Sequence, residues 1–274
     1  MGKIVSVAAT SHTFGNTSGV EQATQRVVEG MAEIGRHIAQ SSPDVLVIVA
    51  SDHLNNFTLD TQIPIAIGIA DEYKPLGDMG IPILTYQGNR DFAQGFAQYS
   101  ADAGFDLVQV ENIFPDHGVA FPNSYSNNQG TTTLVPLYLN TVMVPPPSCA
   151  RAYSLGITLA DYVRTARPED ERVSVVGSGG LSHWICLPES GQVNEEWDNY
   201  VMQTIIDGRG QELVSLSKAE ILAQGGNGGL EIASWVFAAG VSEGRKGRKV
   251  YYEPMVSWWT GMGGIIMDDL STNS

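Results

Sequence analysis

Apolar residues follow two different spacings along this chain. Continuous runs of aliphatic and β-branched residues occupy positions 4–9, 45–49 and 173–176, and each run ends in polar or glycine-rich residues. Such runs are typical of strands that are buried on both faces of a sheet. Between the first two runs, apolar residues recur every three or four positions over 19–40, which predicts an amphipathic helix packed on that sheet.

The other segments extend this alternation to the end of the chain. Residues 63–70 contain Pro64 and predict an edge strand or the start of a strand, and the Pro- and Gly-rich residues 71–88 predict an irregular excursion. Further elements are expected as strands at 107–110, 134–144 and 250–259, as helices at 91–103, 151–165, 195–206, 213–222 and 230–239, and as a glycine-rich edge hairpin after 259. Without a repeat or a break in composition, we predict one α/β domain over residues 1–274, with a central, mostly parallel or mixed sheet flanked by helices.

Four of the five histidines stand just after predicted strands. His12, His53 and His183 follow the three buried runs, and His117 lies in the loop after 107–110. Ligands of open α/β sheets collect outside the carboxyl ends of the strands, so these imidazoles are where chemistry is expected. The fifth, His37, lies within the helical segment and is interpreted as a solvent-facing helix residue.

The run GSGG at 177–180 precedes His183 and admits more than one interpretation. It indicates a tight loop at the end of a strand, which can carry a catalytic histidine. The same run can cradle a phosphate, and His183 can simply cap a helix. A glycine run by itself does not choose between these interpretations.

Composition excludes several classes of protein. The formal net charge is -15 and only 16% of residues are charged, while the one basic cluster, RKGRK at 245–249, is short, so a nucleic-acid partner is not expected. No apolar run approaches the roughly 20 residues that cross a bilayer, and the N-terminus enters a strand without a hydrophobic leader, so we expect a cytoplasmic protein. Cys149 and Cys186 are far apart and share no metal-site spacing, which indicates reduced, incidental thiols.

A metal site can be assembled from His12, His53 and Glu231, the only acidic residue in the apolar segment 230–239. Two histidines and one carboxylate suit non-haem Fe(II), and the same set can hold Zn(II) with one position open for water. The alternative for Glu231 is an ordinary carboxylate at the first turn of a helix. No local signature such as HExxH brings these residues together, so the alternatives remain open. For Asp52 we expect either a hydrogen bond that fixes the His53 tautomer or a surface position.

A series of short motifs carries a family resemblance. The chain resembles the class III extradiol ring-cleaving dioxygenases, and in particular the catalytic β subunit of protocatechuate 4,5-dioxygenase, from residue 1 to about residue 259. The motifs are Thr10-Ser11-His12, Ser51-Asp52-His53, Asp116-His117-Gly118, PPPS at 145–148 with Arg151, GSGGLSH at 177–183, GQVNEEWD at 191–198 and GGLE at 228–231.

The resemblance implies a role for each singled-out residue. His12, His53 and Glu231 match the Fe(II) ligands of the family, His183 matches its catalytic acid/base, and His117 matches a second histidine near the oxygen site. The implied reaction is extradiol cleavage of a catechol-type ring with O2 to a semialdehyde, in the catabolism of aromatic compounds. An imidazole is suited to the acid/base role because it takes and returns a proton near neutral pH.

The substrate and the assembly are less constrained. An uncharged bulky catechol, such as a biaryl or aminobiphenyl diol, suits Trp258, Trp259 and Tyr125, while protocatechuate or gallate would need a cationic partner and the expected loop at 123–128 is neutral. The resemblance leaves open a small helical partner subunit that covers the site, and we expect an oligomer. The alternative function is that of a zinc-binding or non-catalytic relative, which uses the same scaffold as a hydrolase or binding module.

Overall fold

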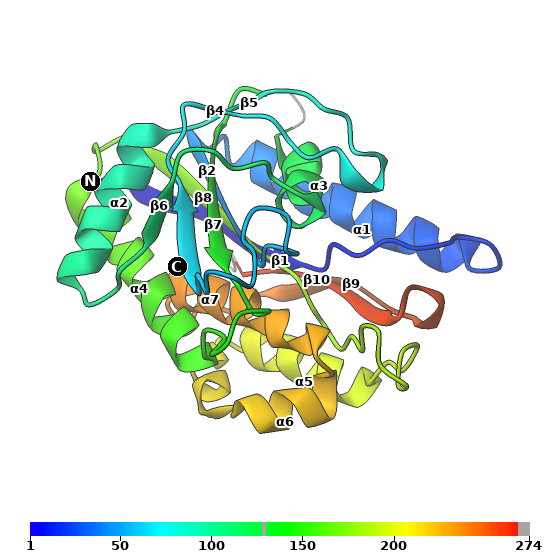
Figure 1. Cartoon of the computed structure of the whole chain (residues 1–274). Coiled ribbons are helices and arrows are strands. Elements are labelled where there is room, and N and C mark those ends of the chain that lie inside the picture. Colours follow the sequence, from blue (N-terminus) through cyan, green and yellow to red (C-terminus); the bar gives the residue numbers. More distant parts are fainter. Residues whose placement is uncertain (128–129, 268–274) are drawn as a thin grey trace.

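Four of the apolar runs lie side by side as parallel strands at the centre of one sheet (Figure 1). The structure is a computed structural model that describes residues 1–127 and 130–267. Within these residues the sheet has eight strands in the order β6-β3-β7-β2-β8-β1-β10-β9. The central strands are β7 (Thr133–Leu139), β2 (Val45–Ala50), β8 (Arg172–Ser178) and β1 (Lys3–Thr10).

Antiparallel strands extend this parallel centre on both sides. β10 (Thr260–Ile266) runs antiparallel to β1 and forms a hairpin with the edge strand β9 (Arg248–Met255), as the glycine-rich end of the chain predicts. On the other side β3 (Ile65–Gly68) runs antiparallel to β7 and pairs with the edge strand β6 (Val108–Val110). The expected mixed, mostly parallel α/β sheet is therefore confirmed.

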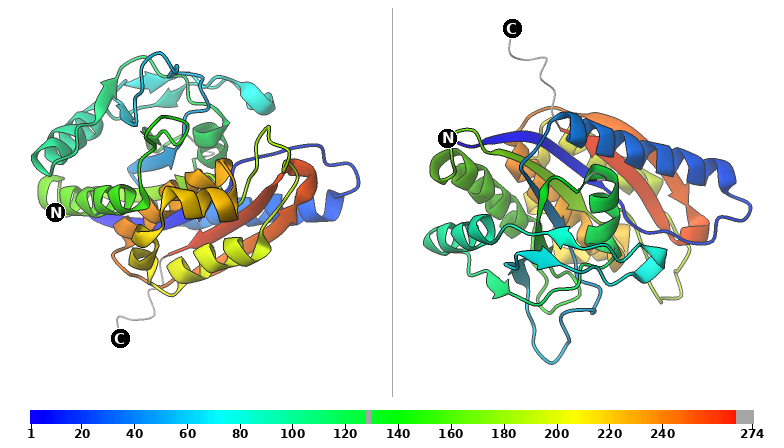
Figure 2. Two further views of the ribbon diagram at one scale, coloured as in Figure 1. Left: turned by 60° about the horizontal axis from the view of Figure 1, so that its bottom comes forward. Right: turned by 90° about the horizontal axis from the view of Figure 1, so that it is seen from above.

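Helices cover both faces of the sheet. The views of Figure 2 show α1 on the opposite side of the sheet from α5. Alternate residues of each strand feed two separate cores, so that Val7 packs toward α4 and α7 whereas Ala8 packs toward α1 and α3. No helix in the described ranges is long and apolar enough to cross a membrane. The helices are α1 (Glu21–Gln40), α2 (Arg90–Asp102), α3 (His117–Ser126), α4 (Cys149–Ala166), α5 (Glu195–Ile206), α6 (Lys218–Gly225) and α7 (Ile232–Ser242).

Capping side chains explain where several helices begin. The side chain of Ser148 accepts a hydrogen bond from the backbone N–H of Arg151, which starts α4. The expected helix at 213–222 is wrong in its first half, because Ser217 and Glu220 form a reciprocal capping box that starts α6 only at Lys218. A short 3-10 helix, Gly210–Ser215, occupies the preceding residues.

Two further expectations around the sheet are corrected. The segment expected as a loop at 123–128 is helical through Ser126, as part of α3, which also contains Pro122; residue 128 lies outside the described ranges. The strand expected at 134–144 ends at Leu139, since the backbone N–H of Asn140 bonds to Pro64 instead of to a neighbouring strand. The excursion at 71–88 contains a two-stranded ribbon of β4 (Glu72–Tyr73) and β5 (Tyr86–Gln87), and a 3-10 turn at Asp78–Gly80.

Candidate active site

His12 enters the site from the carboxyl end of β1. It is 1% exposed, and its Nδ1 lies 2.9 Å from the hydroxyl oxygen of Ser178 at the end of β8. That hydroxyl donates to the carbonyl of Gly118 at 2.6 Å, so it accepts a hydrogen bond from the Nδ1–H of His12. The lone pair of His12 is therefore on Nε2, which faces Glu231.

His53 follows β2 and is held in the same way by a carboxylate. Its Nδ1 lies 2.9 Å from Oδ2 of Asp116, and its Nε2 lies 3.2 Å from Oε1 of Glu231. Asp116 is fully buried at the N-terminus of α3, where it also accepts from the backbone N–H of Gly118 and from the side chain of Asn55. Both oxygens of Asp116 are thus used, one to start the helix and one to fix the His53 ring.

Glu231 lies between the two imidazoles. Its Oε2 is 3.6 Å from Nε2 of His12 and accepts a hydrogen bond of 3.0 Å from the backbone N–H of Gly180. A side chain at Gly179, where φ is +141°, would collide with the Glu231 side chain. The glycine run after β8 therefore allows the Glu231 carboxylate to approach the backbone closely. This contact accounts for the glycines without a bound phosphate.

His117 completes a cluster of three imidazoles. Its ring stacks on His53 with centroids 4.2 Å apart, and its centroid lies 5.1 Å from that of His12. Its Nδ1 bonds to the carboxylate of Asp78, on the 3-10 turn of the excursion. His117 does not stand at the end of a strand on this edge of the sheet. Because β6 runs antiparallel to β2, its carboxyl end lies at the opposite edge, and residues 111–116 lead the chain back to the other histidines.

The donor atoms fit one metal ion. The three histidines each offer an atom within 4.8 Å of the others, and Glu231 lies still nearer to His12 and His53. Two ligands about 2.1 Å from one ion, at angles near 90–110°, are about 3.0–3.5 Å apart, which agrees with the separations around Glu231. An Nδ1 fixed by a hydrogen-bond acceptor, with Nε2 aimed inward, is typical of metal-binding histidines.

Burial and neighbouring charges shift the pKa values of these groups in opposite directions. Burial lowers the pKa of His12 to about 3, although the charge of Glu231 opposes the shift. Burial alone would raise the pKa of Glu231, but the neighbouring His12 and His53 bring it down to about 2. Burial opposes protonation of His53, yet its bonds to Asp116 and Glu231 raise its pKa well above the ordinary value.

His183 lies apart from this cluster. In the described residues no hydrogen bond or ion pair joins it to the other three histidines. Its Nδ1 bonds to the backbone carbonyl of Trp259, and its own backbone pairs with Gly225 and Gly228, just before Glu231. Since a carbonyl only accepts, Nδ1 carries the proton and Nε2 is free to take another. A side chain at Gly228 would collide with the imidazole.

Three residues that hold the imidazoles were missed by the sequence argument. Asp116, Ser178 and Asp78 each accept from an Nδ1, but nothing in the local sequence reports contacts across more than 38 residues. The expectation that Asp52 fixes the His53 tautomer is wrong. Its carboxylate instead accepts backbone N–H groups of residues 55–57 and shapes the loop after β2.

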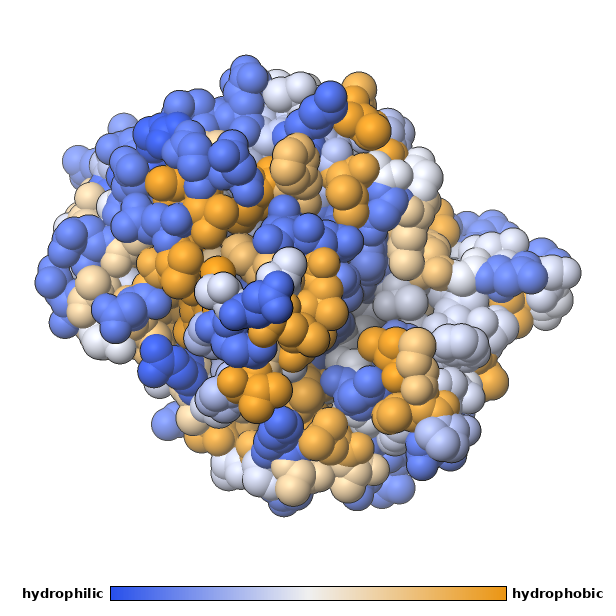
Figure 3. Space-filling view, in the orientation of Figure 1, coloured by the Kyte–Doolittle hydropathy of each residue, from blue (hydrophilic) through white to orange (hydrophobic). Residues whose placement is uncertain are grey.

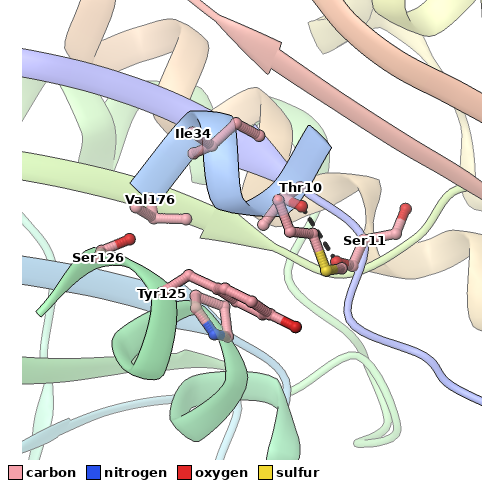
Figure 4. Close-up of a pocket in the computed structure, with 8 residues that line it drawn as sticks. Thr10, Ser11, Ile34, Tyr125, Ser126 and Val176 are labelled. Carbon is pink, nitrogen blue, oxygen red and sulfur yellow. Dashed lines mark hydrogen bonds between the residues drawn. The ribbon is translucent and has the colours of Figure 1, made fainter. Parts of the chain in front are cut away.

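Three aromatic rings pack together shortly after His12 in the chain. Phe14, two residues beyond His12, lies 4.7 Å from the Phe121 ring and 5.2 Å from the Trp258 ring. Tyr125 does not belong to this group. It packs on α1 and lines a cavity of about 10 Å³ beside Thr10 and Ser11, with room for about one water molecule and none for an aromatic ring (Figure 4).

The face of the molecule drawn in Figure 1 has mixed polarity. Apolar and polar patches alternate over it in the space-filling view (Figure 3). Among the described residues, no Lys or Arg side chain bonds to the four histidines, Glu231 or Asp116. The arginines with ion pairs are engaged elsewhere, as Arg90 is with Asp71 and Glu111.

Fold and site together define a class of protein. Two imidazoles and one carboxylate at the carboxyl edge of a sheet are typical of non-haem iron oxygenases. The sequence profile of one such family, the catalytic LigB subunit of aromatic ring-opening dioxygenase, matches residues 8–263. The chain belongs to this family, which confirms the resemblance. It is an oxidoreductase that opens catechol-type rings in the extradiol manner.

Known proteins are similar over nearly the whole chain. A 2,3-dihydroxyphenylpropionate/2,3-dihydroxicinnamic acid 1,2-dioxygenase of Photorhabdus laumondii is 27% identical, covering 94% of this chain and 95% of that protein. A protein of the same description from Pseudomonas putida is 28% identical, covering 95% and 98%. The crystal structure of the uncharacterized protein JW3007 of Escherichia coli K12 has a TM-score of 0.61 at 15% identity, covering 96% of this chain and 100% of that chain, which is a likeness of fold alone.

Proposed function

We propose that this chain is an Fe(II)-dependent dioxygenase that cleaves a bulky uncharged catechol beside its two hydroxyl groups. His12, His53 and Glu231 would hold the ion, and the carbon–carbon bond next to the diol would break. Both atoms of O2 enter the semialdehyde product, so the balance needs no external reductant. The observation that carries the proposal is the placement of Glu231 between two imidazoles whose Nδ1 atoms are already occupied.

The proton chemistry is assigned to the two remaining histidines. When bound, Fe(II) supplies a Lewis acid for the catechol oxygens and a redox centre between the ring and O2. His183 would take the second phenolic proton on Nε2 and later return it, because its Nδ1 is held by Trp259. His117, in its protonated form, would hydrogen-bond the oxygen on which negative charge develops.

The choice of an uncharged substrate follows from charge and shape. The similar dioxygenases named above act on catechols with an acidic side chain, and a buried carboxylate needs a cation or several donors. No Lys or Arg in the described ranges contacts the histidine cluster. Phe14, two residues after His12 in the chain, instead packs with Phe121 and Trp258, and these rings would offer an apolar wall against which an aryl substituent can pack.

Oxygen uptake with a panel of catechols tests the proposal. The protein is purified anaerobically, loaded with Fe(II), analysed for metal, and offered 3-phenylcatechol, 3-methylcatechol, 2,3-dihydroxyphenylpropionate, protocatechuate and gallate. We expect the highest kcat/KM with 3-phenylcatechol and a yellow ring-opened product. A preference for an acidic catechol would overturn the uncharged substrate class. Full zinc occupancy without oxygen uptake would favour the hydrolase or binding role instead.

The assembly is part of the same proposal. We propose an oligomer, with a small helical partner subunit as a further component of the native enzyme. Leu76, Met79, Ile83 and Leu84 of the excursion each expose 41% or more of their surface, which a second chain would cover. Light scattering of the purified chain measures its mass, and co-purification from the native host shows any partner. A monomer that is fully active alone would contradict both expectations.

A further inference from the structure

A buried carboxylate outside the histidine cluster has no cation beside it. Asp198, in the first turn of α5, is 0% exposed. It accepts from the backbone N–H of Ser182 at 2.7 Å, from the Ser182 hydroxyl at 2.9 Å and from the Tyr252 hydroxyl at 2.8 Å. No ion pair in the described part of the chain includes it. Burial raises its pKa to about 6, although these hydrogen bonds partly oppose the shift.

Helix stability alone does not account for this arrangement. Acidic side chains in a first turn are favourable because they face the helix N-terminus, as the exposed Glu195 and Glu196 can. The carboxylate of Asp198 instead bonds to Ser182 and Tyr252, outside its own helix, and the backbone N–H of Trp197 is capped by the side chain of Asn194. A buried carboxylate without a cation is costly, so its three donors indicate a specific task.

Two of the three donors to Asp198 belong to Ser182, in the loop that presents His183, and the third is Tyr252 of β9. Ser182 gives the carboxylate both its N–H and its hydroxyl, and the same hydroxyl accepts from the backbone N–H of Asn194. The next residue is His183, whose Nδ1 bonds to the carbonyl of Trp259. The imidazole of His183 is therefore hydrogen-bonded to a carbonyl, while the preceding residue, Ser182, is hydrogen-bonded to α5 through Asp198.

Hydrogen bonds of this kind fix orientation strongly. Bonds to an ionised acceptor are about twice as strong as neutral ones, and a bidentate pair from one residue also fixes direction. The neighbouring strand adapts to the carboxylate as well, because a side chain at Gly261 would collide with Asp198. The result is a rigid base for a residue that must meet a phenolic proton within hydrogen-bonding distance.

We propose that Asp198 is the positioning residue of His183, and that it keeps the imidazole aligned for proton transfer through Ser182. This inference rests on the proposed role of His183. Asp198 is not placed near the substrate, and its effect passes entirely through the loop at 181–183. Its removal should therefore slow turnover while iron content and substrate affinity are retained.

The kinetic test uses matched substitutions in the iron-loaded protein. For Asp198→Asn we expect kcat to fall about 10- to 100-fold, because a small misplacement of a reacting group costs rate in this range. Iron content, KM and anaerobic catechol binding should stay within about twofold of the wild type. Tyr252→Phe leaves both Ser182 bonds in place and should have a smaller effect. Glu196→Gln, an acid-to-amide change on the exposed side of α5, is the control and should change none of these values.

A second readout does not depend on activity. Nitrogen NMR of labelled histidine in the zinc-substituted protein reports the tautomer of His183, whose signals are assigned by their loss in His183→Gln. We expect one Nδ1–H tautomer in the wild type and a mixture in Asp198→Asn. If Asp198→Asn does not fold, Ser182→Ala provides the same comparison, because it removes the hydroxyl alone.

Each outcome decides between separate claims. Unchanged kcat and an unchanged tautomer in a folded variant overturn the positioning role. A joint loss of iron, affinity and turnover also overturns it, since that pattern means general structural damage. If the wild type takes up no oxygen with any catechol, the proposed function fails, while the tautomer comparison still shows whether Asp198 orients His183.

Discussion

The two ends of the site hold their imidazoles by different partners. At one end, His53 and His117 bond to the carboxylates of Asp116 and Asp78, and His12 bonds to a serine hydroxyl between two buried strands. At the other end, His183 bonds to a neutral backbone carbonyl, that of Trp259. The rings of His12, His53 and His117 lie together, whereas His183 lies on a separate loop.

For His53 and His183, this difference separates binding a cation from moving a proton. A carboxylate partner makes an imidazole a better donor to a positive ion and fixes which nitrogen it presents. A carbonyl partner also fixes the tautomer but adds no charge, so the imidazole can gain and lose a proton without breaking an ion pair. The comparison predicts that substitutions at the two ends fail in different ways.

The largest effect is expected from Glu231→Ala. Loss of a residue that only hydrogen-bonds to a metal ligand already costs about 10- to 100-fold in metal affinity. Loss of Glu231, a proposed ligand itself, should therefore cost more. We expect the purified variant to contain almost no iron by elemental analysis, with ring cleavage lost in proportion. Glu196→Ala, on the exposed face of α5, is the control. An iron content equal to that of the wild type would remove Glu231 from the ligand set.

At the other end, His183→Gln should leave the iron in place. Glutamine retains a polar side chain but cannot carry the proton, and general acid/base catalysis is worth about 10²- to 10⁴-fold. We expect kcat to fall in that range while iron content stays at the wild-type level, with His37→Gln on α1 as the control. Loss of iron together with activity would show that His183 is misassigned and that the two ends are not separate.

The smallest effect is expected on the free energy of unfolding of the metal-free protein as the pH is lowered. Burial holds the pKa of folded His12 at about 3, while the unfolded chain binds that proton near the ordinary value of 6.5. The unfolded state therefore binds this proton first, and the contribution of His12 to the free energy of unfolding should fall by up to about 1.4 kcal/mol per pH unit as pH drops from 6.5 toward 4.5. Asp198, whose pKa is raised to about 6, opposes part of this fall below pH 6. The pKa of His53 is raised by its bonds to Asp116 and Glu231, so its contribution to stability is fully present below pH 6.5 and does not change over this window.

Urea unfolding of EDTA-treated protein at several pH values measures this slope. His12→Gln lacks the titrating group, so its free energy of unfolding should change less over the same window. Below pH 4.5 the depressed pKa of Glu231 adds a second loss of stability in both proteins. Equal slopes for wild type and variant between pH 6.5 and 4.5 would mean that burial of His12 is not what limits the metal-free fold.

Much of the fold was accessible from local patterns. The buried runs ending before His12, His53 and His183 predicted parallel strands with a common functional edge, and the structure has them as β1, β2 and β8. The errors lie where local signals conflict. Pro122 and the polar residues after it indicated a loop, yet Asp116 caps a helix there and α1 packs on it.

The sequence by itself determined the class of fold, the set of histidines and, through its motifs, the family. It did so because the spacing of hydrophobic residues and the ends of strands can be read from a short stretch of sequence, without knowing what that stretch packs against. Only the tertiary structure decided which acceptor fixes each imidazole, since Asp116 meets His53 across 63 residues and Ser178 meets His12 across 166. Such contacts arise because strands and helices that are distant along the chain pack side by side, and no spacing along the chain encodes them.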